Sequence, residues 1–214
     1  MAVNLDDLAQ SIINGKHKIA VEIMNEAIAE NIAPQTIIND GLIAGMAVVG
    51  KKFKANEFYV PEVLIAARAM HKCMDILKPL LIASGAQPVG TVVIGTVKGD
   101  LHDIGKNLVG MMLQGNGFDV IDLGVDVSPE KFIAAAKEGN ANIIALSALL
   151  TTTMPGMKST IDALVASGER EKFKVMIGGA PVTQKYSEEV GADGYSADAA
   201  SAVDLAKILM GIAA

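Results

Sequence analysis

The sequence predicts a protein of two parts, an all-α segment followed by an α/β segment with a doubly wound parallel sheet. Two observations predict this division. Apolar residues recur every three or four positions up to about Ala83, which is the period of amphipathic helices. Beyond the stretch SGAQPVG at residues 84–90, short apolar runs alternate with helical stretches, which is typical of strands in a parallel sheet covered on both faces.

The first part is expected to form four helices. Breaks at Asn14-Gly15, at residues 31–34 and at residues 54–61 divide it, and Pro34 and Pro61 stand near helix starts, where proline is tolerated. Amphipathic helices joined by short connections favour a small four-helix bundle. We therefore expect a helical domain over residues 1–87.

The second part, residues 88–214, carries five apolar runs that predict strands. They are TVVIGTV from Thr91, FDVIDL from Phe118, NIIALS from Asn142, KVMIGG from Lys174 and GYS from Gly194. A helical stretch follows each run, so the expected fold is a flavodoxin-like or Rossmann-like, doubly wound, five-stranded parallel sheet. Ligands of such sheets bind beyond the carboxyl ends of the strands, and chemistry is therefore expected in the loops after the first, third and fourth strands.

Composition narrows the classes of function. The chain has 18 Lys and Arg against 24 Asp and Glu, with no basic stripe or aromatic platform, so nucleic acid is not an expected ligand. The single cysteine, Cys73, lies in an amphipathic run and is expected to be a buried apolar residue, which suits a cytoplasmic location. Neither a signal peptide nor an apolar run near the roughly 20 residues of a membrane span is visible, so no membrane association is expected.

The loop after the first predicted strand reads KGDLHDIGKN and contains the pattern DxHxxG at Asp100, His102 and Gly105. A neutral imidazole binds a metal through one ring nitrogen, and a carboxylate that accepts the N–H of the other nitrogen fixes the tautomer. A capping loop with an exposed histidine explains this loop equally well on its own. Because zinc needs three or four protein ligands, a metal held by His102 must bring most of its ligands with it.

The other two loops carry small residues. ALSALLTTTMPGM follows the third strand, and its Ser147 and Thr151 to Thr153 suit either hydrogen bonding to a flat ligand or local turns. MIGGAPVT follows the fourth strand, and Gly178 and Gly179 favour either close approach of another group or a plain turn. Since all three loops leave the same edge of one sheet, we expect them to surround one ligand.

The run GTVKGDLHDIGKN, then Ser147-Ala148-Leu149, then Gly178-Gly179, resembles in order and spacing the signature of the cobalamin-binding family. That family is typified by the corrinoid-binding part of methionine synthase and by the small corrinoid proteins of methylamine and methanol methyltransferase systems. GMAVVGKKF and YVPEVLIAARAM resemble its helical cap, so the resemblance covers nearly the whole chain. It implies a cobalamin cofactor containing cobalt, as methylcobalamin, cob(I)alamin or a related corrinoid.

The resemblance also implies residue roles. His102 would be the metal ligand that replaces the cofactor's own base, Asp100 would hold its far nitrogen, and Thr153 would extend the hydrogen-bonded chain; these three are the expected catalytic residues. Small residues after the strands would keep a slot open for the released nucleotide tail. The residues expected to bind the cofactor are Gly99, Asp100, Leu101, His102, Asp103, Ile104, Gly105, Ser147, Leu149, Thr151, Thr153, Gly178, Gly179 and Ala199. The chain departs from methionine synthase at Glu62, where that enzyme places a phenylalanine over the upper corrin face.

The function implied by the resemblance is methyl carriage in one-carbon metabolism. The expected partners are a substrate:corrinoid methyltransferase, a second methyltransferase acting on tetrahydrofolate or coenzyme M, and a reductive activase. Because the folate, homocysteine and reactivation domains of methionine synthase have no counterpart in the chain, it is expected to be a carrier subunit that does not catalyse the reaction alone. Two alternatives stay open, a cobalamin-responsive sensor and the cobalamin-binding subunit of a radical mutase. The methyl donor is open among methylamines, methanol, methoxylated aromatics and quaternary amines.

Overall fold

The computed structural model describes residues 3–84 and 87–212. The chain divides into two compact units, one formed by residues 1–88 with residues 115–117 and the other by residues 89–114 and 118–214. Residues 85 and 86, inside the predicted connector, lie outside the described part of the chain.

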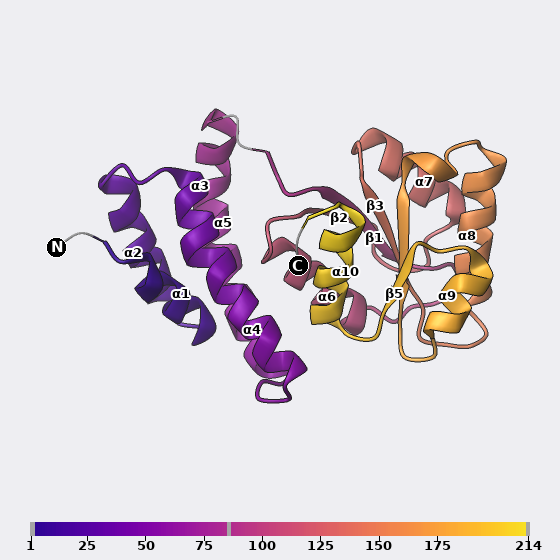
Figure 1. Cartoon of the computed structure of the whole chain (residues 1–214), viewed down its shortest axis with the longest axis horizontal. Helices are drawn as coiled ribbons and strands as arrows, with labels where there is room; N and C mark the ends of the chain where they lie inside the picture. The colour runs from indigo at the N-terminus through magenta and orange to yellow at the C-terminus, as the bar shows by residue number, and fades with distance from the viewer. Residues whose placement is uncertain (1–2, 85–86, 213–214) are drawn as a thin grey trace. The chain divides into compact units, whose positions relative to one another are not determined.

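The first unit is helical (Figure 1). Its elements are α1 (Leu5–Ile13), α2 (His17–Ala29), α3 (Pro34–Thr36), the π-helical turn η1 (Ile37–Ile43), α4 (Ala44–Lys54) and α5 (Val60–Ser84). Because α3, η1 and α4 follow one another without a break, they form one continuous helical segment. Residues 3–84 therefore contain four helical segments, and the predicted helical bundle is confirmed. Side chains define two helix starts: Asn4 accepts the N–H of Asp6 before α1, and Glu62 accepts the N–H of Tyr59 before α5.

Two glycines allow α1 to lie close to the helical segment formed by α3, η1 and α4. Gly41 and Gly45 are one helical turn apart, and an added Cβ would lie 2.6 Å from the side chain of Leu8 and 2.8 Å from the carbonyl oxygen of Ala9, respectively. The π-helical turn around Gly41 is a feature that the sequence pattern does not predict. A helical period of apolar residues does not separate a single π-helical turn from the α-helix around it.

The core of the helical unit contains large apolar side chains without solvent exposure, namely Leu8, Ile12, Met24, Leu42, Met46 and Leu77. Cys73 on α5 is also fully buried, and burial raises the pKa of its thiol to about 12. At neutral pH the thiol is therefore protonated and unreactive. The prediction of a buried apolar cysteine is confirmed.

The second unit is built on a parallel sheet with the strand order β2-β1-β3-β4-β5. The strands are β1 (Thr91–Thr96), β2 (Asp119–Asp122), β3 (Ile143–Ser147), β4 (Lys174–Gly178) and β5 (Gly194–Ser196). Every predicted strand is present, and the predicted fold class is confirmed. The order reverses between β1 and β3, so the loops that follow these two strands leave neighbouring positions at the carboxyl edge of the sheet.

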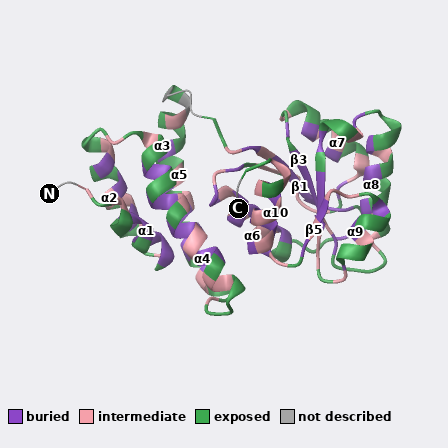
Figure 2. Ribbon diagram, in the orientation of Figure 1, coloured by how far each residue is buried: buried purple, intermediate pink, exposed green. Residues whose placement is uncertain are grey.

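Helices cover both faces of this sheet (Figure 1). They are α6 (Ile104–Gln114), α7 (Pro129–Glu138), α8 (Pro155–Ala166), the 3-10 turn η2 (Arg170–Lys172), α9 (Gln184–Val190) and α10 (Ala199–Leu209). Helix α6 packs with α10, and α7 packs with α8. The central strands are almost wholly buried (Figure 2), as their continuous apolar sequences require.

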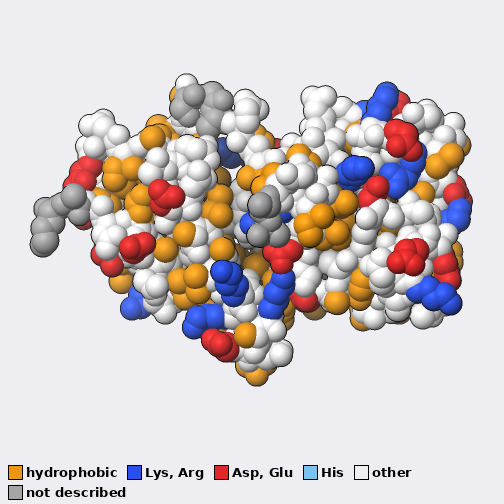
Figure 3. All heavy atoms as spheres, in the orientation of Figure 1, with side chains coloured by type: hydrophobic (Ala, Val, Ile, Leu, Met, Phe, Trp, Pro, Cys, Tyr) orange, Lys and Arg blue, Asp and Glu red, His pale blue; other side chains and the backbone are white. Residues whose placement is uncertain are grey.

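The surface carries charges of both signs. On the face shown in Figure 3, acidic and basic side chains are interspersed rather than gathered into one basic patch. Within residues 3–84 and 87–212, no helix combines the length and the apolar character needed to cross a bilayer.

Candidate functional site

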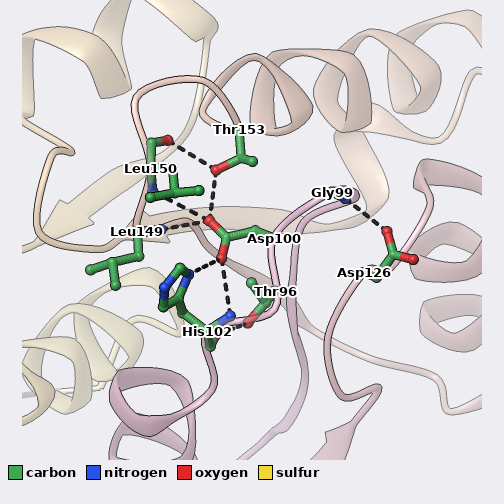
Figure 4. Close-up of polar contacts among 8 residues, drawn as sticks. All are labelled: Thr96, Gly99, Asp100, His102, Asp126, Leu149, Leu150 and Thr153. Atoms are coloured by element: carbon green, nitrogen blue, oxygen red, sulfur yellow. Dashed lines mark hydrogen bonds and ion pairs between the residues drawn. The ribbon is translucent and has the colours of Figure 1, made fainter.

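Asp100 is the centre of a polar network beyond the end of β1 (Figure 4). Its carboxylate is fully buried. Oδ2 accepts hydrogen bonds from the Thr153 hydroxyl at 2.6 Å and from the backbone N–H groups of Leu149 and Leu150 at 2.8 and 3.3 Å. Oδ1 accepts from ring Nδ1 of His102 at 2.7 Å and from the His102 backbone N–H at 3.1 Å. The loops after β1 and β3 therefore meet at one carboxylate.

These contacts decide the protonation state of Asp100. Burial alone raises the pKa of a carboxyl group, because a charge is less stable away from water. The hydrogen bonds from Thr153, Leu149 and His102 outweigh burial and hold the pKa of Asp100 well below its usual range. At neutral pH Asp100 is thus ionised and only accepts hydrogen bonds.

The ionised carboxylate fixes the tautomer of His102. Since Asp100 only accepts, the tautomer that fits this contact carries its proton on Nδ1 and has a lone pair on Nε2. The His102 side chain is 49% exposed, so that lone pair is accessible to a ligand. The main chain of His102 is held as well, because the Thr96 hydroxyl at the end of β1 donates to its carbonyl oxygen at 2.8 Å.

Exposed apolar side chains lie beside His102 in the sequence and also in the loop after β3. Leu101 and Ile104 are 72% and 77% exposed, and Leu149 and Leu150 are each 43% exposed. A group of large exposed apolar side chains is typical of a binding site. Together with a single accessible imidazole, they fit a flat, largely apolar group whose metal already carries most of its ligands.

The glycines at this edge of the sheet have different roles. Gly105, in the first turn of α6, has open space where a Cβ would lie, with no neighbouring atom within 4 Å. Gly179 has a φ of +131°, and an added Cβ would lie 1.9 Å from the carbonyl oxygen of Ala148. The close approach of the loops after β3 and β4 therefore already requires glycine at position 179. Gly178 pairs with Ser147 across β3 and β4.

The remaining predicted site residues are not all near the Asp100 network. The N–H of Gly99 donates to Asp126 at 2.7 Å, Asp103 accepts from the side-chain amide of Asn107 at 3.2 Å, and Thr151 is exposed in the loop after β3. Ala199 is 5% exposed at the start of α10, after β5. Because β3 and β4 lie between β5 and β1, Ala199 belongs to a different part of the sheet edge.

Sequence reasoning missed two contacts that hold this region. Asp126 accepts from Gly99, and Nζ of Lys106 pairs with Asp122 at 2.5 Å. The partners are 27 and 16 residues apart, so no local motif relates them. Lys106 is only 3% exposed, although a lysine in an amphipathic helix is ordinarily at the surface.

Gly179→Ala is expected to lower the free energy of unfolding by about 3–5 kcal/mol, because it adds backbone strain at positive φ and a clash with the Ala148 carbonyl. Gly191→Ala is the matched control: its φ is +79°, but the space around an added Cβ is open, so the cost is about 1–2 kcal/mol. Urea unfolding of both variants measures the difference. Equal losses would show that the clash with Ala148 has no energetic consequence.

Comparisons with known proteins agree with one another over both units. Residues 90–204 and residues 5–78 each match a family model described as a B12 binding domain. A corrinoid protein of Desulfitobacterium hafniense is 41% identical over 97% of this chain and 97% of its own length. A dimethylamine corrinoid protein of Methanosarcina barkeri is 46% identical over 96% of this chain and 97% of its own length.

Solved structures show the same likeness. A cobalamin-binding protein of Desulfitobacterium hafniense is 34% identical, with a TM-score of 0.80, over 97% of this chain and 99% of its own. A chain of the methanol:cobalamin methyltransferase complex of Methanosarcina barkeri is 33% identical, with a TM-score of 0.85, over 95% of this chain and 78% of its own.

Proposed function

Because the chain belongs to the family of cobalamin-binding, methyl-carrying corrinoid proteins, we propose that it binds its corrinoid with the cofactor's own base displaced and with His102 as the lower axial ligand. The contact that supports this proposal is the hydrogen bond of 2.7 Å between Nδ1 of His102 and Asp100, which leaves an accessible Nε2. Residues 88–214 would hold the cofactor through the loops after β1, β3 and β4, and residues 1–87 would serve as its helical cap.

The bound corrinoid would supply the cobalt centre that accepts and gives up the methyl group. The chain's own residues would orient that centre and adjust its ligand. Thr153 and the backbone N–H groups of Leu149 and Leu150 keep Asp100 ionised, and Asp100 keeps the proton of His102 on Nδ1. Since a carboxylate partner strengthens the donor nitrogen of a ligating imidazole, Asp100 would strengthen the bond of His102 to the metal.

Two protein partners follow from methyl carriage. One is a substrate:corrinoid methyltransferase that loads the methyl group, and the other is a methyltransferase that passes it to tetrahydrofolate or coenzyme M; a reductive activase would restore oxidised cofactor. The relative named for dimethylamine is 46% identical, and the chain from the methanol complex is 33% identical. Methylated amines are therefore the first donors to test.

The carrier role is tested with the full chain reconstituted with hydroxocobalamin and freed of unbound cofactor. After reduction, it is incubated with carbon-14 dimethylamine and a dimethylamine:corrinoid methyltransferase, and then with the methanol and trimethylamine pairs. The expected result is label that elutes with the chain, in an amount equal to the bound corrinoid, for at least one donor. A chain that binds corrinoid but takes up no label from these pairs would contradict methyl carriage from methylated amines and methanol. No label from methoxylated aromatic and quaternary amine pairs as well would contradict the carrier role and favour a sensor.

Gly105→Ala separates cofactor binding from folding. The apoprotein should be as stable as the wild type, or up to about 1 kcal/mol more stable, because alanine favours helix and the position is open. Corrinoid affinity should fall about tenfold or more, because the methyl group enters space proposed for the released nucleotide tail. Urea unfolding and corrinoid titration measure the two effects.

The control for this variant is Gly110→Ala in the same helix, where an added Cβ would make an ordinary contact of 3.8 Å with Val120. It should leave corrinoid affinity unchanged. If Gly105→Ala also binds corrinoid like the wild type, the tail does not occupy that space.

A further inference from the structure

Asp126, in the loop between β2 and α7, makes two hydrogen bonds with the loop after β1. Its Oδ1 accepts one from the N–H of Gly99 at 2.7 Å (Figure 4). Its own N–H donates to the carbonyl oxygen of Asp100 at 3.0 Å. The two bonds connect Gly99 and Asp100, in the DxHxxG loop, to the loop that follows the neighbouring strand β2.

The backbone of Asp126 adopts a left-handed conformation, with φ of 54°. That conformation costs free energy for any residue with a Cβ, although aspartate and asparagine tolerate it best. The other described non-glycine residues with positive φ are all asparagines: Asn31, Asn56 and Asn140. Glycine or asparagine would satisfy the turn equally well. What aspartate adds is a charged acceptor, which makes a stronger hydrogen bond than a neutral one.

The turn that Asp126 contacts is loosely packed. Gly99 has a φ of +83°, and the nearest atom to an added Cβ would be Cγ2 of Thr153, at 3.8 Å. Glycine has more accessible backbone conformations than any other residue, and the side chains around Gly99 do not restrict its backbone conformation. The hydrogen bond to the Gly99 N–H therefore restrains this turn directly before Asp100, beside the bond of 3.1 Å from the Asp100 N–H to the carbonyl oxygen of Val97.

We propose that Asp126 is a positioning residue for the corrinoid-binding function. By holding Gly99, it keeps the Asp100 carboxylate directed at Nδ1 of His102 before the cofactor binds. Thr96 holds the other end of the same loop through the His102 carbonyl. A loop that is already ordered in the free protein binds its ligand more tightly, because less conformational freedom is lost on binding. The role rests on the proposed function, since Asp126 acts through His102.

Two substitutions of Asp126 separate the acceptor from the turn. Asp126→Gly keeps the positive φ without strain but removes the acceptor. Asp126→Asn keeps both the conformation and a neutral oxygen acceptor. Asn140→Gly is the matched control, because it adds a glycine at another positive-φ position, with φ of 46°, in the same unit. If Asp126 served the turn alone, Asp126→Gly would behave as the wild type does.

The first readout is the Gly99 amide of the full-length apoprotein, observed by nitrogen-15 NMR and hydrogen exchange. An amide that donates to a carboxylate resonates at low field and exchanges slowly. Asp126→Gly should move this resonance upfield and speed its exchange by about tenfold or more, Asp126→Asn should restore most of the protection, and Asn140→Gly should change neither. An unchanged Gly99 amide in Asp126→Gly would overturn the proposal.

The second readout is cofactor binding, by titration and by electron paramagnetic resonance of bound cob(II)alamin. Asp126→Gly should bind about tenfold more weakly and show a smaller fraction with histidine nitrogen on the metal, whereas Asp126→Asn should bind within about threefold of the wild type. If the melting temperature of Asp126→Gly is well below that of Asn140→Gly, the results for Asp126→Asn are used instead to test the proposal. Recovery of affinity and histidine ligation in Asp126→Asn then supports the proposal, and their loss overturns it.

The outcomes distinguish the role of Asp126 from the proposed function. One outcome is that the wild type shows histidine ligation of the corrinoid while Asp126→Gly shows the same ligation and the same corrinoid affinity. That result would overturn the positioning role of Asp126 alone. A wild-type protein that binds no corrinoid would overturn the proposed function, and the positioning role with it.

Discussion

Replacing His102 with glutamine is expected to lower corrinoid affinity by about tenfold to a hundredfold, because the cofactor loses its only proposed protein ligand to the metal. The apoprotein should change in unfolding free energy by less than about 1 kcal/mol, because the His102 side chain is 49% exposed. Titration followed by the corrinoid visible spectrum measures the affinity, and urea unfolding measures the stability. The spectrum of whatever cofactor binds should be that of corrinoid without histidine ligation.

His17→Gln is the matched control for this variant, since it removes another partly exposed histidine, at the start of α2. It should bind corrinoid as the wild type does. If His102→Gln also keeps wild-type affinity and the wild-type spectrum, then His102 is not the ligand.

Asp100→Asn is expected to affect both folding and cofactor binding. Five donors converge on the two oxygens of the buried Asp100 carboxylate. An amide has one oxygen and an NH2 group, so the NH2 must face donors and some hydrogen bonds are lost. The expected cost is about 1–3 kcal/mol in the apoprotein, with a fall of about tenfold to a hundredfold in corrinoid affinity because His102 is no longer oriented.

The stability effect of Asp100→Asn should depend on pH. Since the pKa of Asp100 is lower in the folded than in the unfolded protein, the carboxylate stabilises the fold at every pH above its unfolded pKa of about 4. That stabilisation is lost as the pH falls further, toward the folded pKa. The unfolding free energies of wild type and variant should therefore converge below about pH 4. A constant difference, or none at neutral pH, would contradict the network.

Thr153 provides the matched pair for this experiment. Thr153→Val removes the hydroxyl that donates to Asp100 at 2.6 Å, and Thr153→Ser keeps it. The valine variant should show a smaller loss of the same kind as Asp100→Asn, and the serine variant should stay near the wild type. A valine variant with wild-type stability and affinity would show that the hydroxyl has no part in the network.

The sequence predicts the parts of this molecule that depend on local pattern. Continuous apolar runs predict β1, β3 and β4, because central strands of a parallel sheet are buried on both faces. The edge strands β2 and β5 are predicted from shorter and more polar runs. The short spacing of Asp100 and His102 predicts their contact, since two residues in one loop readily reach each other. The buried position of Cys73 follows from its place in an amphipathic helix.

Contacts between distant segments are what the sequence does not predict. Asp126 reaches Gly99, and Lys106 is buried against Asp122, only because β1 and β2 are neighbours in the sheet. The glycine at position 179 is required by the Ala148 carbonyl of another loop, so its reason is visible only in three dimensions. Ala199 follows β5, which β3 and β4 separate from β1, so its place in the cofactor site stays a prediction.

The central claim, that a protein histidine replaces the cofactor's own base, is tested most directly by electron paramagnetic resonance of the protein with bound cob(II)alamin. The protein is grown with nitrogen-15 histidine and reconstituted with unlabelled cofactor. If His102 is the ligand, the axial nitrogen splits the lines of the labelled protein into doublets. The same protein grown without the label should show triplets. A triplet in the labelled protein would show that the cofactor keeps its own base, and it would contradict the proposed role of His102.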